Sequence, residues 1–274
     1  MTLLISQARS LLTRRAFVGL STLTAAGLLA GCGTKGSSSS ASQDDPCPYN
    51  WANLRWEDGR PVYYEGDAVR SRWGVDVSEH QQRVDWEAVA AAGVQFAFVR
   101  IGNRGATEGL LGVDEFFFQN ADGATRAGIP LSAYFFSQSV NEDEAREEAA
   151  FAMEQLRVAE QGGASFQYVA YDHEPVDIDG ARANNLPSNQ FTANARAFCE
   201  AVAQAGYAPM LYGNQTDLLR LTANERRAWP LWLAEYGVEA PSAPFNFALW
   251  QYTNAGTVPG INTPADLNIW FETA

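Results

Sequence analysis

The sequence predicts an α/β fold: an irregular TIM-like (β/α) barrel with roughly five strand–helix units followed by three helix-poor strands. From residue 73 onwards, short apolar segments rich in β-branched and aromatic residues alternate with longer helical patterns, which is typical of a parallel sheet. Eight strands can be counted, the number that closes a barrel of this kind in about 250 residues. An open doubly wound sheet is the alternative. Such a sheet usually carries a Gly-rich nucleotide turn after its first strand, and none is present here.

The N-terminus has the pattern of a targeting segment. Arg14-Arg15 precede an apolar run from Ala16 to Ala30, as in a twin-arginine export signal. The run ends in Leu29-Ala30-Gly31-Cys32, which resembles a bacterial lipobox with Cys32 as the lipidated residue. We therefore expect residues 1–31 to be a signal peptide and residues 32–45 a flexible Ser-rich tether. The protein would then be exported and lipid-anchored to the outer face of a bacterial cell membrane. An ordinary signal peptide or a single membrane anchor is the alternative, although the run is short for a span of about 20 residues.

Residues 46–72 form an aromatic-rich lead-in. Asp58-Gly59 lies between two alternating runs, which predicts a hairpin over residues 54–64. We expect its aromatic side chains to pack on the main domain, and a small wall-contacting element is the alternative. Cys47 and Cys199 could form a disulfide in an exported protein. Cys199 also lies in a helical pattern, where a buried thiol is equally compatible.

The catalytic barrel is expected over residues 73–274. Its strands are predicted at residues 74–78, 96–101, 131–136, 168–175, 209–213, 231–236, 247–252 and 266–271. Helices are predicted over residues 85–93, 116–127, 141–160 and 189–205. Asp85 and Asn141 are placed to cap two of these helices, and Gly93, Gly128 and Gly206 follow helix ends.

Charge and composition exclude several classes of function. A formal net charge of −13 leaves no basic face for nucleic acid. The chain has two histidines, His80 and His173, and no Cys/His cluster with metal-site spacing, so no metal or other cofactor is expected. Ser78 and His80 lie close in sequence, but no third partner for a catalytic triad can be identified.

Two carboxylates close the fourth predicted strand. Asp172 and Glu174 are two residues apart, so in a strand they face the same side, with Cβ atoms roughly 6.5–7 Å apart. Such a pair repels, one member tends to keep its proton near neutral pH, and the pair can cleave a glycosidic bond. A solvated acidic strand end is the alternative. His173, between them, should face the other way and pack against the fold.

Further polar and aromatic residues fall on or near strand ends, where barrels of this kind carry their chemistry. Asp76 lies in the first strand and Asp266 begins the last. These strands are neighbours in a closed barrel, so the two acids should come close together. The remaining candidates for substrate binding are Tyr134, Tyr212, Trp232, Gln251 and Tyr252.

Four motifs in this order resemble the glycoside hydrolase family 25 lysozymes, over about residues 73–271. The opening signature is Asp76-Val77-Ser78-Glu79-His80-Gln81 with Val84-Asp85-Trp86. Phe96–Arg100 and Ala133–Phe136 are similar to the next two strands of the family. Asp172-His173-Glu174 is similar to the Asp-x-Glu motif, and Trp250–Thr253, Val258–Ile261 and Ala265–Asn268 to the closing signature. Many members of the family carry a Tyr-His-Phe run where this sequence has Tyr134-Phe135-Phe136, so the histidine of that run is absent here.

The resemblance implies an N-acetylmuramidase that hydrolyses the β-1,4 bond between N-acetylmuramic acid and N-acetylglucosamine in peptidoglycan. Glu174 would be the general acid, and Asp172 would stabilise the transition state or an intermediate derived from the N-acetyl group. Asp76 and Asp266 would be further acids of the pocket. We expect a monomer that acts on peptidoglycan glycan strands. A non-catalytic glycan-binding surface lipoprotein is one alternative, and a barrel hydrolase of chitin-like polymers or peptide amides is another.

Overall fold

The computed structural model describes residues 45–272. The predicted signal peptide, Cys32 and nearly all of the tether lie outside these residues. Within residues 45–272, none of the helices combines the length and the apolar character needed to cross a membrane.

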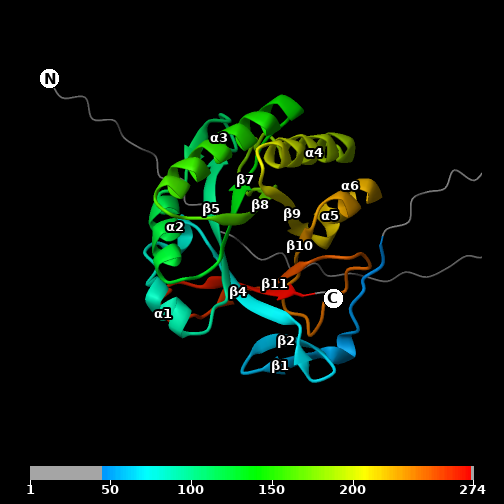
Figure 1. Ribbon diagram of the computed structural model, residues 1–274. Coiled ribbons are helices and arrows are strands. Elements are labelled where there is room, and N and C mark those ends of the chain that lie inside the picture. Colours follow the sequence, from blue (N-terminus) through cyan, green and yellow to red (C-terminus); the bar gives the residue numbers. More distant parts are fainter. Residues whose placement is uncertain (1–44, 273–274) are drawn as a thin grey trace, which may run out of the picture. The chain divides into compact units, whose positions relative to one another are not determined.

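Eight strands close into a barrel, which confirms the mixed α/β class and the eight-stranded closure (Figure 1). A ninth short strand, β6 (Leu111–Val113), pairs antiparallel with the edge of β5. In spatial order the barrel strands are β4 (Ser71–Val77), β12 (Ala265–Phe271), β11 (Leu249–Gly256), β10 (Leu231–Ala234), β9 (Ala208–Asn214), β8 (Phe166–Asp172), β7 (Leu131–Phe136) and β5 (Phe96–Arg104), and β5 pairs again with β4.

The direction of the last strand differs from the parallel arrangement expected from the sequence. All pairings from β4–β5 through β10–β11 are parallel, but β12 runs antiparallel to both β11 and β4. The cause is the short connection Thr257–Pro264. A parallel crossover needs a dozen residues or more, so a chain with so short a link must turn back on itself. A TIM barrel has eight parallel strands, and this barrel departs from that pattern at β12.

Helices follow one another around the outside of the barrel in chain order (Figure 1). They are α1 (Trp86–Ala91), α2 (Phe117–Arg126), α3 (Glu142–Gln161), α4 (Ser188–Gln204), α5 (Gln215–Arg220) and α6 (Ala223–Ala228). Both predicted caps are confirmed: Asp85 accepts a hydrogen bond from the Ala88 amide, and Asn141 accepts one from the Glu144 amide. The short helices α5 and α6 were not predicted, because six residues are too few to show a helical period.

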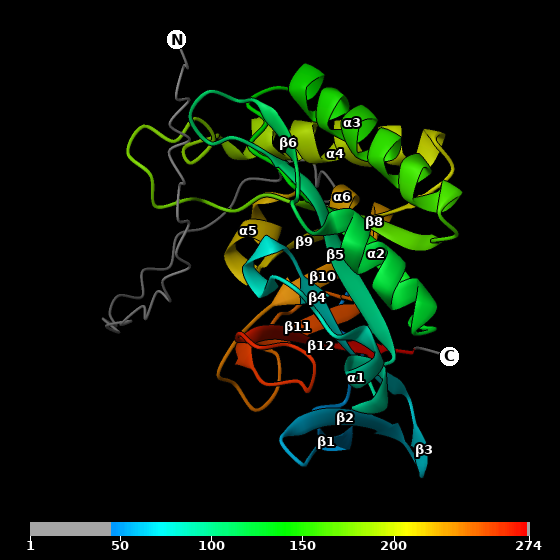
Figure 2. The same cartoon turned by 90° about the vertical axis from the view of Figure 1, so that its left-hand side faces the viewer.

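The lead-in forms a separate sheet of three strands, β1 (Leu54–Glu57), β2 (Arg60–Glu65) and β3 (Ala68–Val69), preceded by a 3-10 turn over Trp51–Asn53. The predicted hairpin is confirmed, and Asp58 and Gly59 both have the positive φ angles that a tight hairpin turn requires. Figure 2 shows this sheet below β12 and α1, with α3 and α4 at the opposite end of the view. Its aromatic rings pack on the barrel as expected: the Tyr49 ring stacks on Phe271 with centroids 4.2 Å apart.

Strand alternation divides the core into two clusters. The inner cluster fills the barrel and consists of Phe96, Phe98, Tyr134, Ala170, Met210, Tyr212, Trp232, Ala234, Leu249 and Trp270. The outer cluster lies between the barrel and its helices, and includes Val75 and Val77 of β4 and Val169 and Tyr171 of β8. Most barrel strands therefore present one face to each cluster, whereas β4 contributes only to the outer one.

Both remaining cysteines are free, so the disulfide alternative is not what the structure shows. Cys199 is fully buried on α4, and burial raises the pKa of its thiol. The buried-thiol alternative therefore holds for Cys199.

Candidate active site

The fourth barrel strand positions one of the two paired acids. Tyr168 and Ala170 of β8 belong to or pack against the inner cluster, so alternation turns Asp172 to the same interior face. Asp172 is 2% exposed. Its strand neighbour on β9 is Tyr212, which also faces the interior.

Glu174 lies beyond the strand, which corrects the strand predicted over residues 168–175. The strand β8 ends at Asp172, and Glu174 follows in irregular backbone, partly buried. The separation expected from strand geometry therefore does not apply to this pair. The backbone on both sides of His173 is held by the segment after β7. Ser137 donates its amide to the Asp172 carbonyl over 2.7 Å, and Gln138 Nε2 donates to the Glu174 carbonyl over 2.9 Å.

Asp76 and Asp266 are direct partners across the β4–β12 ladder, as expected from barrel closure. The Cα atoms of directly opposite residues in an antiparallel pair lie about 4.5–5.5 Å apart. Both side chains are buried. Because β12 is antiparallel, its first residues lie at the same end of the barrel as the last residues of β4. Asp76, Asp172 and Asp266 are thus at one rim, with Glu174 two residues further on.

Two amides hold Asp76. Its Oδ2 accepts from Gln251 Nε2 at 2.7 Å and from Asn268 Nδ2 at 2.8 Å. Gln251 Oε1 in turn accepts from the Tyr212 hydroxyl at 2.8 Å and from the Tyr236 hydroxyl.

The same network reaches the aromatic residues. Trp232 Nε1 donates to Asn268 Oδ1 at 2.8 Å, so three predicted residues, Tyr212, Trp232 and Gln251, are linked to Asp76. Asn268 and Tyr236 were not predicted as site residues. Asn268 could have been found, because it lies two residues after Asp266 on the same face of a strand. Tyr236 lies beyond β10, where alternation no longer indicates direction, and it remains 40% exposed.

A buried cation also lies inside the barrel beside Tyr134. Arg100, on β5, forms ion pairs with Asp114 and Glu79, each over 2.8 Å. Burial by itself would lower the pKa of Arg100, but Tyr134, Asp114 and Glu79 together raise it. Tyr134 packs edge-on against Trp232 with ring centroids 6.0 Å apart. Sequence reasoning missed Arg100, although an arginine within the otherwise apolar run Phe96–Ile101 is itself a signal of a buried partner.

Tyr252 lies apart from these residues. It follows Gln251 in β11 and therefore faces the outer cluster, where its hydroxyl accepts from Trp73 Nε1 over 3.0 Å. Trp56 of the lead-in packs on its ring at 5.7 Å. The structure thus brings four of the five predicted binding residues to the interior and leaves Tyr252 outside the barrel.

His173 packs against the fold, as predicted. Its ring lies 5.2 Å from that of Phe191 on α4 and is parallel to that of Tyr171. Burial, followed by the charge of Arg220, lowers the pKa of His173 to about 4, so the ring is neutral at pH 7. Phe135 also faces outward, between Phe151 and Phe198. Among residues 45–272, no three His, Cys, Asp or Glu side chains are grouped so as to hold a metal ion.

Comparisons with known proteins agree with this architecture. The family model for glycosyl hydrolases family 25 matches residues 75–261. An autolytic lysozyme of Clostridium acetobutylicum is 27% identical over 201 residues, which cover 73% of this chain and 56% of that protein. Lysozyme M1 of Streptomyces globisporus is 27% identical over 206 residues, covering 71% of this chain and 66% of that protein.

Solved structures share the fold. The modular autolysin LytC from Streptococcus pneumoniae superposes with a TM-score of 0.64 at 23% identity, covering 80% of this chain and 52% of that one. The bacterial lysozyme from Streptomyces coelicolor superposes with a TM-score of 0.58 at 23% identity, covering 74% of this chain and 93% of that one. The chain thus spans about half the length of the Clostridium lysozyme and of LytC. Because the family model spans well over half of the sequence, this chain belongs to glycosyl hydrolases family 25.

Proposed function

We propose that the protein is a lysozyme that hydrolyses the β-1,4 bond between N-acetylmuramic acid and N-acetylglucosamine in peptidoglycan. The observation that carries the proposal is the placement of the acids within a family 25 fold. Asp76, Asp172 and Asp266 lie at one rim of the barrel, and Glu174 follows Asp172 by two residues. This is the rim at which the parallel strands end, where TIM-like barrels carry their chemistry. The seven barrel strands that keep the parallel arrangement, β4, β5 and β7 to β11, support that reading.

Glu174 is proposed as the general acid. A general acid must hold its proton when substrate binds, and burial beside another anion favours this. Glu174 is partly buried and follows buried Asp172 by two residues. It would donate its proton to the glycosidic oxygen as the bond to the anomeric carbon breaks.

Asp172 would stabilise the positive charge that develops on the sugar. The oxygen of the substrate's own N-acetyl group would attack the anomeric carbon, so no enzyme nucleophile is needed. Water would then open the cyclic intermediate, giving its proton to the Glu174 carboxylate. Asp76, fixed by Gln251 and Asn268, would hold sugar or water together with Asp266.

The aromatic side chains at this rim would bind the glycan. Tyr134, Tyr212 and Trp232 belong to the inner cluster, and Tyr236 presents a half-exposed ring while its hydroxyl contacts Gln251. Aromatic faces bury apolar area and keep a polar handle, which suits sugar rings.

The test is digestion of purified sacculi by residues 43–274, a compact unit, followed by mass analysis of the fragments. A muramidase releases fragments with reducing muramic acid ends. Glu174→Gln should lose nearly all activity, by at least about 100-fold, while its circular dichroism spectrum and melting temperature remain those of the parent. Binding to sacculi without fragment release by the parent protein would support a glycan-binding role instead. Parental activity in the variant would show that Glu174 is not the acid.

For the segment outside residues 45–272, we propose export and lipidation at Cys32, with a likeness to a lipobox as the support. The tether would keep a monomeric enzyme near the outer face of the membrane while it acts on the wall. Cys32→Ala should release the protein from the membrane fraction, and mass spectrometry of the parent's N-terminal peptide should show the added lipid. A membrane-bound Cys32→Ala protein with no lipid on the parent would contradict this.

A further inference from the structure

The backbone around His173 is held by one short segment, Ser137-Gln138-Ser139, referred to below as the clamp. Ser137 donates its amide to the carbonyl of Asp172 over 2.7 Å. Gln138 donates its side-chain amide to the carbonyl of Glu174 over 2.9 Å. All three clamp residues are fully buried. The clamp therefore bonds to the backbone of both proposed catalytic carboxylates, one residue on each side of His173.

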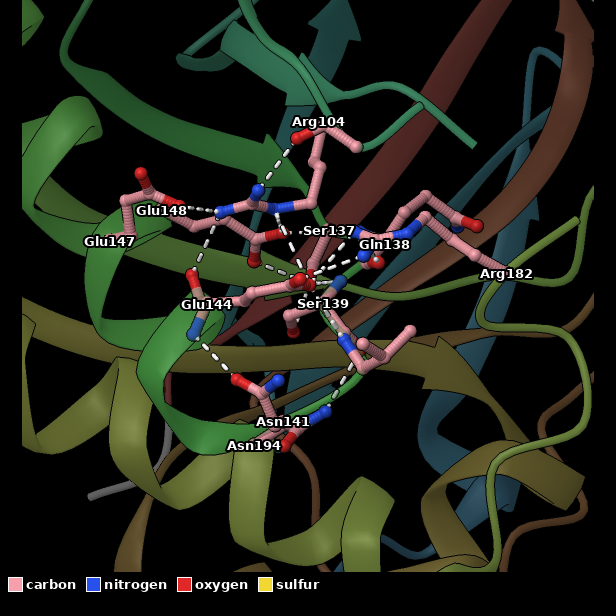
Figure 3. Close-up of polar contacts among 12 residues, drawn as sticks. Arg104, Ser137, Gln138, Ser139, Asn141, Glu144, Glu147, Glu148, Arg182 and Asn194 are labelled. Atoms are coloured by element: carbon pink, nitrogen blue, oxygen red, sulfur yellow. Dashed lines mark hydrogen bonds and ion pairs between the residues drawn. The ribbon is translucent and has the colours of Figure 1, made fainter. Parts of the chain in front are cut away.

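A buried carboxylate on α3 holds the clamp in turn (Figure 3). Glu148 Oε2 accepts from the Ser137 hydroxyl at 2.6 Å. Glu148 Oε1 accepts from the backbone amide of Gln138 at 3.3 Å and from Arg104 Nε at 2.8 Å. Its side chain is completely inaccessible to solvent. Among the residues that the structure describes, every side-chain partner of Glu148 except Arg104 thus belongs to the clamp.

Two further contacts fix the other end of the clamp. Asn194 on α4 donates to the Ser139 carbonyl over 2.9 Å, and Arg182 donates to the Gln138 carbonyl over 3.4 Å. Arg182 itself forms an ion pair with Glu144 at the start of α3. Three separate parts of the chain, α3, α4 and the segment before α4, therefore converge on three clamp residues.

Stability alone does not account for this arrangement. A buried ion pair is often no better for stability than apolar side chains of the same volume. Burial raises the pKa of Glu148 to about 7 in spite of the hydrogen bonds from Ser137 and Arg104. Gln138 is also a costly choice, because its buried Oε1 has no hydrogen-bond partner among the described residues. Within residues 45–272, the only hydrogen bond of its side chain is the one to the Glu174 carbonyl.

We propose that Gln138 and Glu148 are positioning residues for the reaction: Glu148 fixes the clamp, and the clamp fixes the backbone from which Asp172 and Glu174 project. This inference rests on the function proposed above. Neither residue contacts the reacting atoms. A displacement of a catalytic group by about 1 Å can cost on the order of 100-fold in rate, so a loosened clamp should lower kcat while leaving substrate affinity nearly unchanged.

The activity test compares three variants on soluble peptidoglycan fragments, using the full chain. Gln138→Met keeps the volume and removes the donor, so kcat should fall by about 10- to 100-fold with KM changed less than about 2-fold. Gln138→Glu should be as slow wherever its carboxyl is ionised, because a carboxylate cannot donate to the Glu174 carbonyl. Burial beside Glu148 raises the pKa of such a carboxyl above its free value, and as the pH falls through that pKa the protonated group regains the donor, so its rate relative to the parent should recover. Gln138→Met should show no such recovery.

Glu225→Gln is the matched control for Glu148→Gln. Glu225 is a buried carboxylate on α6 that pairs with Arg196 Nε over 2.8 Å rather than with a clamp residue. Both variants lose a buried charge, but only Glu148→Gln should lower kcat. Equal kcat values for Glu148→Gln, Glu225→Gln and the parent would overturn the proposal, as would a Gln138→Glu profile that follows Gln138→Met at all pH values.

Hydrogen exchange tests the clamp without relying on activity. The Ser137 amide should exchange at least about tenfold faster in Glu148→Gln than in Glu225→Gln, because only the former releases the clamp. Unchanged protection of Ser137 would overturn the proposal. If the parent fails to cleave peptidoglycan but the Ser137 amide loses protection in Glu148→Gln, the role of Glu148 in holding the clamp is supported and the proposed function fails. If the parent cleaves and Gln138→Met cleaves equally well, the function stands and the positioning role fails.

Discussion

Asp76 accepts both of its amide hydrogen bonds on a single oxygen, and the two donors come from different strands of the barrel. Of the two donors, Asn268 also satisfies a second buried group, because its side-chain oxygen accepts from the indole N–H of Trp232. Removing Asn268 leaves two buried polar groups without this partner, and each such loss costs about 1–3 kcal/mol.

We therefore expect Asn268→Leu to lower the free energy of unfolding by about 2–6 kcal/mol. Urea denaturation of the variant and of Asn262→Leu, an exposed position in the preceding loop, would measure this. The control should stay within about 0.5 kcal/mol of the parent. A similar small change for Asn268→Leu would show that the Asp76 network contributes little to folding.

The buried ring of His173 should make the stability of the protein depend on pH. Its pKa falls from 6.5 to about 4 on folding, chiefly through burial and then through Arg220. Between these values the unfolded chain binds a proton that the folded protein does not, so this residue lowers stability as the pH falls from 6.5 to 4. The loss is on the order of 3 kcal/mol. Glu148 acts in the opposite sense, since its pKa rises on folding and its contribution is lost as the pH rises from 4.5 to about 7.

His173→Phe removes the first effect and keeps the second. The difference in unfolding free energy between parent and variant should therefore shift in favour of the variant by roughly 3 kcal/mol between pH 7 and pH 4. Chemical denaturation at several pH values measures it. A difference that does not change with pH would mean that His173 is as easily protonated in the folded protein as in the unfolded chain.

At the scale of whole elements, α3 is the helix on which both the core and the clamp depend. Asn141 caps its first turn, where Glu142, Asp143 and Glu144 also favour the positive end of the helix dipole. Asn141→Ala should destabilise the protein by about 1 kcal/mol, whereas Asn141→Asp should retain the cap. Thermal denaturation of the pair tests this, and equal melting temperatures for Ala and Asp would argue against a capping role.

Most elements could be predicted from local signals. Asp85, Asn141, Gly128 and the Asp58-Gly59 turn all mark boundaries that depend on nearby backbone only, and the structure confirms them. The strand β8 ends earlier than predicted, because Pro175 limits a strand but does not show how many residues before it are still paired. The direction of β12 follows from the length of Thr257–Pro264, which is too short for a parallel crossover.

The site was predictable only in part, for a related reason. Asp76 and Asp266 could be paired because barrel closure makes neighbours of the first and last strands. Tyr252 was grouped with Gln251, although adjacent strand residues face opposite sides. Gln138 comes from the segment after β7, Glu148 from α3 and Arg104 from β5, and only tertiary packing brings them together. No spacing in the sequence indicates such a contact.

At the scale of the whole molecule, the lead-in is joined to the barrel by aromatic packing. Tyr49 contacts the rings of Phe271, Phe247, Trp51 and Tyr63, and its hydroxyl donates to the Phe247 carbonyl over 2.5 Å. Tyr49→Ala should cost about 3 kcal/mol, and Tyr49→Phe, which loses only the hydrogen bond, about 1 kcal/mol.

If the lead-in and barrel unfold together, both Tyr49 variants should keep a single transition that moves to lower urea concentration. Tryptophan fluorescence, which samples both parts, and far-ultraviolet circular dichroism should then coincide. A new early transition seen by fluorescence alone would show that the lead-in unfolds independently and that the barrel does not depend on it.

The antiparallel strand β12 has a consequence for biosynthesis. Asp76 cannot accept its hydrogen bond from Asn268 until the ribosome has added that residue, 192 positions later. For the same reason β4 has no second barrel neighbour until β12 is complete. At about 5–20 residues per second, the nascent chain passes many seconds with an open sheet and an incomplete set of acids. We therefore expect an enzyme built this way to stay inactive during its own translation and to become competent to cut only after β12 has left the exit tunnel and paired with β4.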